Sequence, residues 1–252
     1  MIILIESNAS SLTSPITPTA SRVLKISAPW LFCGGDSHAM SLVPGLLHLQ
    51  QFHPFGLMVL AAAQCPPVLD VKPYLFRSEC DDYSKRDLDL ISKIQPEALI
   101  IASTYREPRY FWTNEYFENH FSKTLEQIRR NSPKTKVIII GPTPRWSDSP
   151  QSVFFSKWLR TVKKEPTSIS QNAYQVHGYD ELLSRQAQLQ GYQFINMWNI
   201  FCKDRQCLTR IGDTAQDFIA VDYGHLSKAG SIYAINHSAN TLLNALGILK
   251  AH

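Results

Sequence analysis

The chain has 252 residues, 44% of them hydrophobic and 18% charged, which is typical of one ordered globular domain and excludes a disordered chain. Its net charge of +4 is small, and the longest basic stretches are pairs such as Lys163-Lys164. A nucleic-acid-binding protein needs a denser basic face, so we expect no nucleic-acid partner. No apolar run is long enough to cross a bilayer.

The first 29 residues differ in composition from the rest. Met1-Ile-Ile-Leu-Ile is followed at once by Glu6 and has no basic residues before it, so it does not resemble a signal peptide. Residues 7–29 are rich in Ser, Thr and Pro. We therefore predict that residues 1–29 are a linker or an N-terminal extension and that residues 30–252 form one domain.

The predicted elements then alternate along the chain. A short apolar run at 30–33 ends at Gly34-Gly35, which indicates a buried strand and a tight turn. A helix is predicted at 37–50, a strand at 56–62, a helix at 84–94 and a strand at 98–102. Further along, the pattern predicts a helix at 114–130 and a strand at 136–140, closed by Gly141-Pro142.

A helix at 172–190, a strand at 192–196 and a last helix at 227–249 complete the pattern, and residues 142–171 form the longest predicted irregular stretch. The strands are continuous apolar runs, which is typical of a parallel sheet covered on both faces. The predicted fold is a three-layer α/β/α, flavodoxin-like domain with a parallel sheet of about five strands.

Ligands of open α/β sheets bind beyond the carboxyl ends of the strands. That rule selects four segments here, at 34–38, 63–67, 103–109 and 141–146. In the first, Ser37 opens a helix directly after the two glycines. A serine there presents its hydroxyl at the sheet edge and its backbone N–H at a helix N-terminus, which suits attack on an ester. The alternative is an ordinary helix-capping serine.

The segment Asp222-Tyr-Gly-His225 lies just before the last helix. His225 can accept the proton of Ser37, and Asp222 can accept the other ring N–H and fix the tautomer. Alternatively, Asp222 caps the helix and His225 is a surface residue. Together the two segments predict a Ser37–His225–Asp222 catalytic triad.

Four of the five cysteines fall into two local pairs, and one is left over. Local pairs in loop-like sequence suggest disulfides and an oxidising compartment, while five free thiols in a reducing compartment is the alternative. The cysteine and histidine spacings do not fit a zinc site, and we predict no metal and no cofactor.

These motifs resemble the SGNH, or GDSL-like, hydrolase superfamily, and most of all the SGNH domain fused to membrane acyltransferase-3 proteins that O-acetylate bacterial surface polysaccharides. The resemblance runs from Trp30 to the C-terminus. It is carried by GDSHA at 35–39, DxxHLS at 222–227, CPP at 65–67, VIIIGPTP at 137–144 and the Cys202…Cys207 pair.

The resemblance implies that Ser37 is the nucleophile, His225 the general base and acid, and Asp222 the orienting carboxylate. It also implies Cys65–Cys80 and Cys202–Cys207 disulfides in a periplasmic or other extracytoplasmic domain, tethered to the membrane through a separate partner. Cys33 would then be a buried thiol. The implied partners are an acyl donor, a saccharide acceptor and a membrane acyltransferase-3 module.

The superfamily pattern is incomplete at two strand ends. A Gly after the second strand and an Asn after the third normally supply oxyanion donors, and both are absent here. The backbone N–H groups of Ser37 and Gln64 are the candidates for this role. Tyr105, Arg106 and Trp146 are candidate substrate-binding residues, although packing or solvation of the loops is the alternative.

The predicted function is a serine-dependent O-acyltransferase or esterase that acts on a surface saccharide through an acyl-serine intermediate, with acetyl as the expected acyl group. The alternative is a weakly active or inactive carbohydrate-binding or interaction domain with the same fold, which the missing Gly and Asn would favour.

Overall fold

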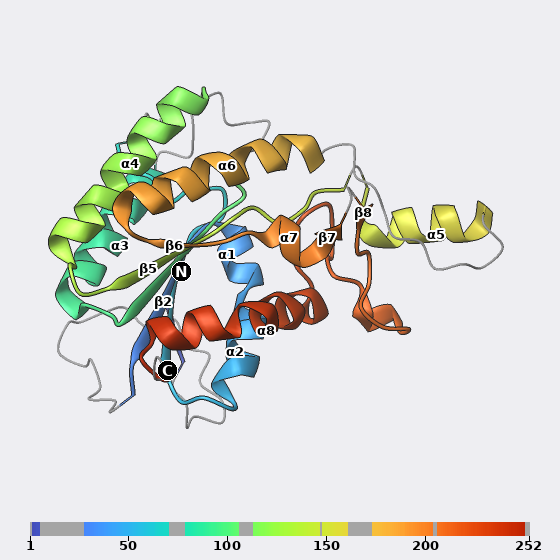
Figure 1. Cartoon of the computed structure of the whole chain (residues 1–252), viewed down its shortest axis with the longest axis horizontal. Coiled ribbons are helices and arrows are strands. Elements are labelled where there is room, and N and C mark those ends of the chain that lie inside the picture. The colour runs from blue at the N-terminus through green and yellow to red at the C-terminus, as the bar shows by residue number, and fades with distance from the viewer. Residues whose placement is uncertain are drawn as a thin grey trace.

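Figure 1 shows a computed structural model of the chain, which describes residues 2–5, 28–70, 79–105, 113–146, 148–160, 173–203 and 206–249. Its centre is a six-stranded sheet with the order β1-β3-β2-β4-β5-β6. Five of these strands are mutually parallel: β2 (Trp30–Gly35), β3 (Gly56–Ala61), β4 (Ala98–Ala102), β5 (Lys136–Ile140) and β6 (Gln193–Ile195). The predicted five-stranded parallel sheet is confirmed.

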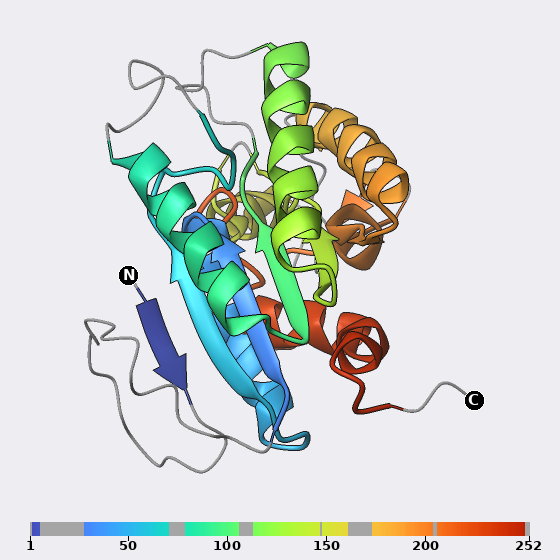
Figure 2. The same ribbon diagram turned by 90° about the vertical axis from the view of Figure 1, so that its left-hand side faces the viewer.

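The sixth strand, β1 (Ile2–Ile5), pairs antiparallel with β3 at the edge of the sheet (Figure 2). Residues 2–5 therefore add an edge strand to the sheet, and the division into a linker or N-terminal extension at 1–29 and a domain at 30–252 stays a prediction. Four consecutive Ile and Leu residues have a strong strand propensity.

Two sets of helices cover the two faces of the sheet (Figures 1 and 2). On one face lie α3 (Cys80–Ile94), α4 (Asn114–Asn131) and α6 (Ala173–Gln190), and on the other lie α2 (Val43–Gln50) and α8 (Lys228–Ala245). Strand residues alternate between these two cores: Leu31 and Cys33 pack with α2 and α8, and Phe32 packs with α3 and α4. Because both faces are buried, the strands are apolar throughout.

The predicted helix at 37–50 is divided into α1 (Ser37–Ser41) and α2. Pro44, near the start of α2, has no N–H to donate to the carbonyl four residues earlier, and its ring clashes with that carbonyl, so a continuous helix cannot pass through it. Leu42 links the two helices and donates its N–H to the carbonyl of Ala39 (3.1 Å). The break leaves Ser37 on a short helix of its own.

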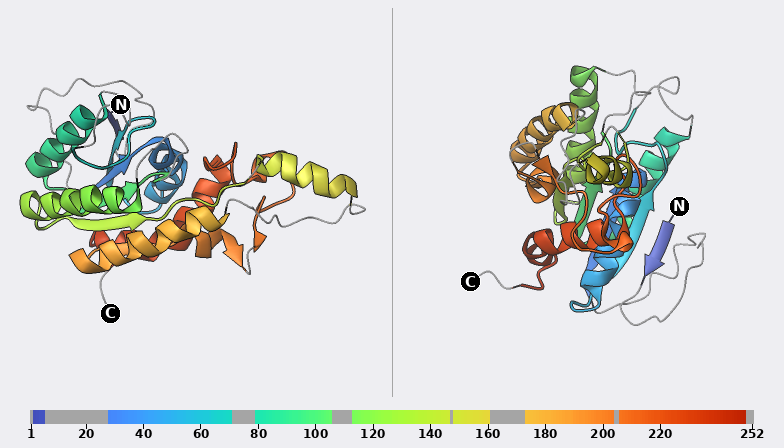
Figure 3. Two further views of the ribbon diagram at one scale, coloured as in Figure 1. Left: turned by 90° about the horizontal axis from the view of Figure 1, so that it is seen from above. Right: turned by 90° about the vertical axis from the view of Figure 1, so that its right-hand side faces the viewer.

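The stretch predicted as irregular at 142–171 contains a helix, α5 (Pro150–Arg160), which projects from the body of the domain (Figures 1 and 3). Pro150 is favourable at a first helical position, and the Ser149 hydroxyl accepts the N–H of Ser152 (3.2 Å), as a helix cap does. Phe154 anchors the helix against Phe218, with 5.6 Å between ring centroids. These signals were present in the sequence, but the Ser and Pro content obscured them.

Between β6 and α8 the chain forms a short helix, α7 (Met197–Phe201), a two-stranded hairpin of β7 (Cys202–Lys203) and β8 (Gln206–Cys207), and a 3-10 turn at Ala215–Asp217. This region leads into the segment that carries Asp222 and His225, which ends where Ser227 caps α8 by accepting the N–H of Gly230 (3.1 Å).

Gly35 allows a test of how closely β2 and β4 approach each other. Its φ is +144°, and a Cβ at this position would lie 1.7 Å from the carbonyl oxygen of Ala102. We expect Gly35→Ala to lower the free energy of unfolding by more than about 3 kcal/mol, or to prevent folding, because backbone atoms must move. Chemical denaturation measures the effect.

Gly34→Ala is the matched control, because a Cβ there would meet its nearest neighbours at ordinary contact distances of 3.7 Å and 3.8 Å. Similar stabilities for the two variants would contradict the close approach of β2 and β4.

A second test concerns Asp180 on α6, whose side chain is buried against the end of β5. Burial, with a smaller effect of Glu181, raises the pKa of Asp180 from 3.8 to about 7. The folded protein therefore holds a proton that the unfolded chain releases between these two values, so stability from this group is present at low pH and is lost as the pH rises from about 4 to about 7.

We expect Asp180→Asn, which remains neutral, to match the wild type near pH 4 and to become more stable than it as the pH rises. The difference should level off above about pH 7, with an upper limit of about 4 kcal/mol. Urea denaturation across this pH range measures it. A stability difference that does not vary with pH would contradict the raised pKa.

Candidate active site

The turn after β2 presents Ser37 at the carboxyl edge of the sheet. Asp36 caps α1, and its Oδ1 accepts the backbone N–H of His38 (2.7 Å). The same carboxylate reaches the end of β4, where its Oδ2 accepts the Ser103 hydroxyl (2.7 Å) and the Thr104 N–H (3.0 Å). Asp36 therefore connects two strand ends and fixes the direction in which Ser37 leaves the sheet.

The Asp36 carboxyl is 1% exposed and is ionised at neutral pH. Burial alone would raise its pKa, but interactions with His38 and hydrogen bonds from Thr104 and Ser103 outweigh burial and hold the pKa below the usual value. The charge is thus kept inside the domain by donors aimed at both oxygens.

The second turn lies before α8 and folds around Asp222. Its Oδ1 accepts the backbone N–H groups of Gly224 (2.9 Å) and His225 (2.8 Å), which forms a compact turn. Partial burial raises the pKa of Asp222, but these bonds and the His225 side chain outweigh it and lower the pKa overall. Asp222 is therefore a carboxylate at neutral pH.

The two turns meet. The Ser37 Oγ lies 2.8 Å from His225 Nε2, although 188 positions separate the two residues. On the other side of the ring, His225 Nδ1 lies 2.7 Å from Asp222 Oδ2. With the proton on Nδ1, the imidazole donates to Asp222, and Nε2 is the acceptor that faces the serine hydroxyl. This is the geometry in which a histidine can remove a proton from a serine.

Residues after β5 hold the second turn in place, and of these only Trp146 was selected individually from the sequence, as a candidate substrate-binding residue. Thr143 donates its hydroxyl to the carbonyl of Gly224 (2.6 Å), and the Trp146 N–H donates to the carbonyl of Tyr223 (3.0 Å). Arg145 lies with its guanidinium carbon 5.2 Å from the Tyr223 ring centroid and donates to the Thr104 hydroxyl. The sequence feature that could have identified them is their position in the strand-end segment 141–146.

Two of the candidate substrate-binding residues are core residues instead. Tyr105 is 0% exposed, and its hydroxyl lies 3.0 Å from the carbonyl oxygens of both Ile101 and Ile140. Trp146 is 1% exposed and packs in the core on the α2 and α8 face. Large aromatic rings bury more surface in the core than in a loop, so the proposed substrate contact is corrected for both residues.

Arg106 and Gln64 are the other two residues that the sequence suggested for substrate or oxyanion binding. Arg106 lies outside the described residues. Gln64 is exposed in the turn after β3 and has a φ of 62°. Its role as an oxyanion donor stays a prediction.

Both implied disulfides are present. Cys65–Cys80 joins the loop after β3 to the start of α3, and Cys202–Cys207 closes the β7–β8 hairpin. Cys33 is a free, buried thiol, and its burial raises the pKa to about 12. It is therefore not a thiolate at neutral pH and is not a rival nucleophile to Ser37.

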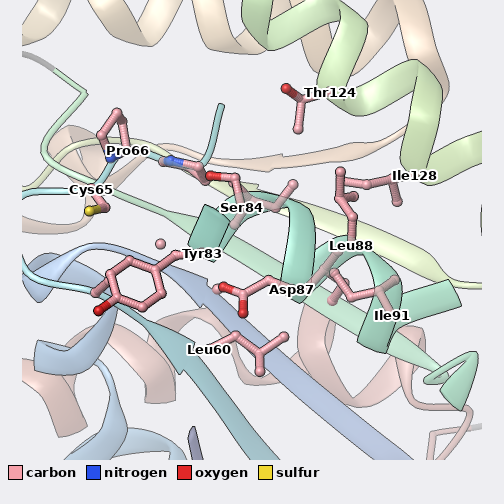
Figure 4. A pocket seen from close by; sticks show the side chains of 16 residues that line it. Leu60, Cys65, Pro66, Tyr83, Ser84, Asp87, Leu88, Ile91, Thr124 and Ile128 are labelled. Carbon is pink, nitrogen blue, oxygen red and sulfur yellow. The ribbon is translucent and has the colours of Figure 1, made fainter. Parts of the chain in front are cut away.

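A cavity of about 50 Å³ lies between the sheet and helices α3 and α4 (Figure 4). Its walls are mainly apolar and include Leu60 from β3 and Leu88 and Ile91 from α3. The carboxyl group of Asp87, also on α3, lines the cavity as well. Gly34 and Gly35 form part of the wall, but Ser37, Asp222 and His225 do not line it. The cavity is therefore separate from the hydrogen-bonded serine.

Metal sites and membrane-spanning helices are both absent from the part of the chain that the structure describes. Within these ranges, no group of three or more His, Cys, Asp or Glu side chains is arranged to hold a metal ion. No helix among those described is both long and apolar enough to cross a membrane.

A comparison with protein families matches residues 16–237 to the SGNH domain that occurs fused to AT3 domains. The chain belongs to this SGNH family. A comparison with curated proteins finds no match.

Solved structures with the SGNH fold resemble the domain along most of its length. The periplasmic domain of the lipopolysaccharide acetyltransferase of Salmonella ser. Paratyphi A has a TM-score of 0.75 at 23% identity, over 86% of this chain and 84% of that one. Est24, a carbohydrate acetylesterase from Sinorhizobium meliloti, has a TM-score of 0.52 at 12% identity, over 86% and 99% of the two chains. At these identities the likeness establishes a fold shared with acyltransferases and esterases.

The disulfides of the SGNH domain allow a direct test of stability. We expect the double variant Cys65→Ala/Cys80→Ala to lower the free energy of unfolding by about 3 kcal/mol, because the 15-residue separation closes a substantial loop in the unfolded chain. Cys202→Ala/Cys207→Ala, with a separation of 5, should cost less. Denaturation of both variants under oxidising conditions measures the difference, and a larger loss in the second variant would contradict this order.

Proposed function

We propose that this SGNH domain is a serine-dependent O-acyltransferase or esterase in which Ser37, His225 and Asp222 form the catalytic triad. The observation that carries the proposal is the 2.8 Å contact between Ser37 Oγ and His225 Nε2, continued by the 2.7 Å contact to Asp222. The fold shared with acyltransferases and esterases also supports it.

The proposed reaction has two half-reactions. In the first, His225 Nε2 takes the Ser37 proton as Ser37 Oγ attacks the carbonyl carbon of an acyl ester. The bond to the leaving group then breaks, and His225 returns the proton to that group. In the second, His225 takes a proton from a sugar hydroxyl or from water as that oxygen attacks the acyl-Ser37 ester. The bond between the acyl carbon and Ser37 Oγ then breaks, and His225 returns the proton to Oγ, which regenerates the serine.

Stabilisation of the oxyanion is assigned to backbone donors. Ser37 is the first residue of α1, so its N–H is not used within the helix, and we propose that it donates to the oxyanion. We propose Gln64 N–H as the second donor, because Gln64 follows β3 at the same sheet edge. Thr104 occupies the strand end where the superfamily pattern has an Asn.

The proposed acceptor is a hydroxyl of a bacterial surface saccharide, and the proposed acyl group is acetyl. The resemblance to the Salmonella lipopolysaccharide acetyltransferase domain supports this assignment. The family of SGNH domains fused to AT3 domains supports a membrane AT3 module as the partner that supplies the acyl group. Two disulfides favour an extracytoplasmic location.

A test of the triad uses hydrolysis of a chromogenic acetyl ester by the purified domain. We expect Ser37→Ala to lower kcat/KM at least about a thousandfold, and Asp222→Asn at least about a hundredfold, because these changes remove the nucleophile and the correct ring tautomer. Ser92→Ala on α3 is the control and should retain full activity. Equal rates for wild type and Ser37→Ala would remove Ser37 from the mechanism.

Transfer and hydrolysis are separated by adding an oligosaccharide acceptor and following the products by mass spectrometry. Acetylated saccharide formed by the wild type and not by Ser37→Ala would establish transfer.

The second candidate function is an interaction domain that binds carbohydrate without turnover. The absence of the superfamily Gly and Asn after the second and third predicted strands favours it. This alternative predicts saccharide binding that Ser37→Ala leaves intact, together with no ester hydrolysis above background in the wild type.

A further inference from the structure

His38 lies directly against His225. The two imidazole rings are stacked, with 4.2 Å between their centroids and 28° between their planes. His38 is 5% exposed, so its ring is covered by the protein. Because His38 and Ser37 are adjacent on α1, their side chains leave the helix in different directions. Ser37 therefore contacts the edge of the His225 ring, and His38 contacts its face.

The surroundings of His38 connect it to a second carboxylate. Its Nδ1 lies 3.5 Å from Asp36 Oδ1, the oxygen that also accepts the backbone N–H of His38. Among the described residues, neither ring nitrogen has a hydrogen-bond partner that satisfies normal geometry. His38 is thus held by stacking and by the charge of Asp36 and not by hydrogen bonds to its ring.

The second turn leaves room for this ring. A Cβ on Gly224 would lie 3.3 Å from His38 Nε2, so a larger residue at this position would press on the imidazole. The same Cβ would lie 3.6 Å from Arg145 Cγ. The titratable or charged groups that face the stacked pair are thus Asp36 from the first turn, Asp222 and Tyr223 from the second, and Arg145 from the loop after β5.

We propose that His38 is a positioning residue for His225. The His38 ring packs against the face of the His225 imidazole and keeps the Asp36 carboxylate next to the stacked pair. The proposal rests on the function proposed above for Ser37 and His225. Asp222 fixes the edge of the His225 ring, and His38 prevents the ring from tilting out of the plane that points Nε2 at Ser37.

The arrangement has an electrostatic consequence. When His225 takes the Ser37 proton it becomes a cation, and the π face of His38 together with the buried Asp36 carboxylate favours that cation. The two stacked rings interact electrostatically with each other and with the carboxylates of Asp36 and Asp222. A change at His38 is therefore expected to alter the protonation of His225 as well as its orientation.

The experiment distinguishes the packing of the His38 ring from the ability of that ring to be protonated. His38→Ala removes the support, and His38→Phe restores a flat ring that cannot be protonated. His38→Gln, of similar length and without a ring, replaces His38→Ala if that variant does not fold. His48→Phe on α2 is the matched control, because it removes an imidazole elsewhere. Measured quantities are kcat and KM for the acetyl ester across pH, and the NMR titration of the His225 ring without substrate.

We expect His38→Ala to lower kcat about tenfold with KM within about twofold of wild type, because orientation of the base is lost and substrate contacts are not. His38→Phe should return kcat to within about threefold of wild type. In His38→Ala the protonated His225 ring loses the π face that favours it, whereas in His38→Phe a phenyl face takes its place. The acidic limb of the kcat profile should therefore move to lower pH in His38→Ala and stay near its wild-type position in His38→Phe.

The proposal is overturned if His38→Phe is no faster than the ringless variant, if the ringless variant retains wild-type kcat, or if the His225 ring titrates identically in the ringless variant and in wild type. The NMR readout does not depend on turnover. If Ser37→Ala hydrolyses the ester as fast as wild type, the proposed function fails, while a His225 titration that moves to lower pH in the ringless variant and not in His38→Phe would still establish the coupling between the two rings.

Discussion

The position of Ser37 depends on how closely β2 and β4 approach each other where both strands end. Gly35 has no side chain, and a Cβ there would overlap the Ala102 carbonyl. One residue later, the buried Asp36 carboxylate accepts hydrogen bonds from Ser103 and Thr104 at the end of β4. The turn therefore cannot rotate without breaking contacts to a neighbouring strand, and Ser37 leaves the sheet in one direction.

The position of His225 depends on a different contact, between the helices that follow the two turns. In α2, a Cβ on Gly45 would lie 2.3 Å from the Ser231 carbonyl oxygen of α8, and the Gly45 N–H donates to the Ser231 hydroxyl (2.8 Å). Because α2 follows the Ser37 helix and α8 follows the His225 turn, this close packing determines the separation of the two turns. The 2.8 Å contact between serine and histidine is thus a consequence of the core.

The sequence was most informative where local and global patterns agree. The strands β4 and β5 were predicted with the bounds that the structure shows, because each is a short apolar run buried on both faces. The meeting of Ser37 with His225 was also predictable, since strand ends of a parallel sheet share one edge and the motif order matches a known family. The disulfide pairing was available only through that resemblance.

Other features depend on side-chain packing and could not be predicted from the pattern. Tyr105 and Trp146 follow strands in the segments where ligands bind, yet both rings turn inward, and only the surrounding core determines this. His38 was given no role from the sequence beyond its place in the GDSHA motif, yet it stacks on His225, which lies 187 positions away in the sequence. Contacts between residues so far apart become visible only in three dimensions.

The outcome of the proposed reaction depends on how much water reaches Ser37, His225 and Asp222. The side chains of His225 and Asp222 are 24% and 41% exposed, so solvent reaches the edge of the site. An acyl-serine in such a site is open to hydrolysis, and transfer requires an acceptor that binds before water attacks and displaces it. The proposed triad would serve both reactions equally. The choice between esterase and transferase therefore rests on the groups that hold the acceptor over Ser37 and not on the nucleophile or its base.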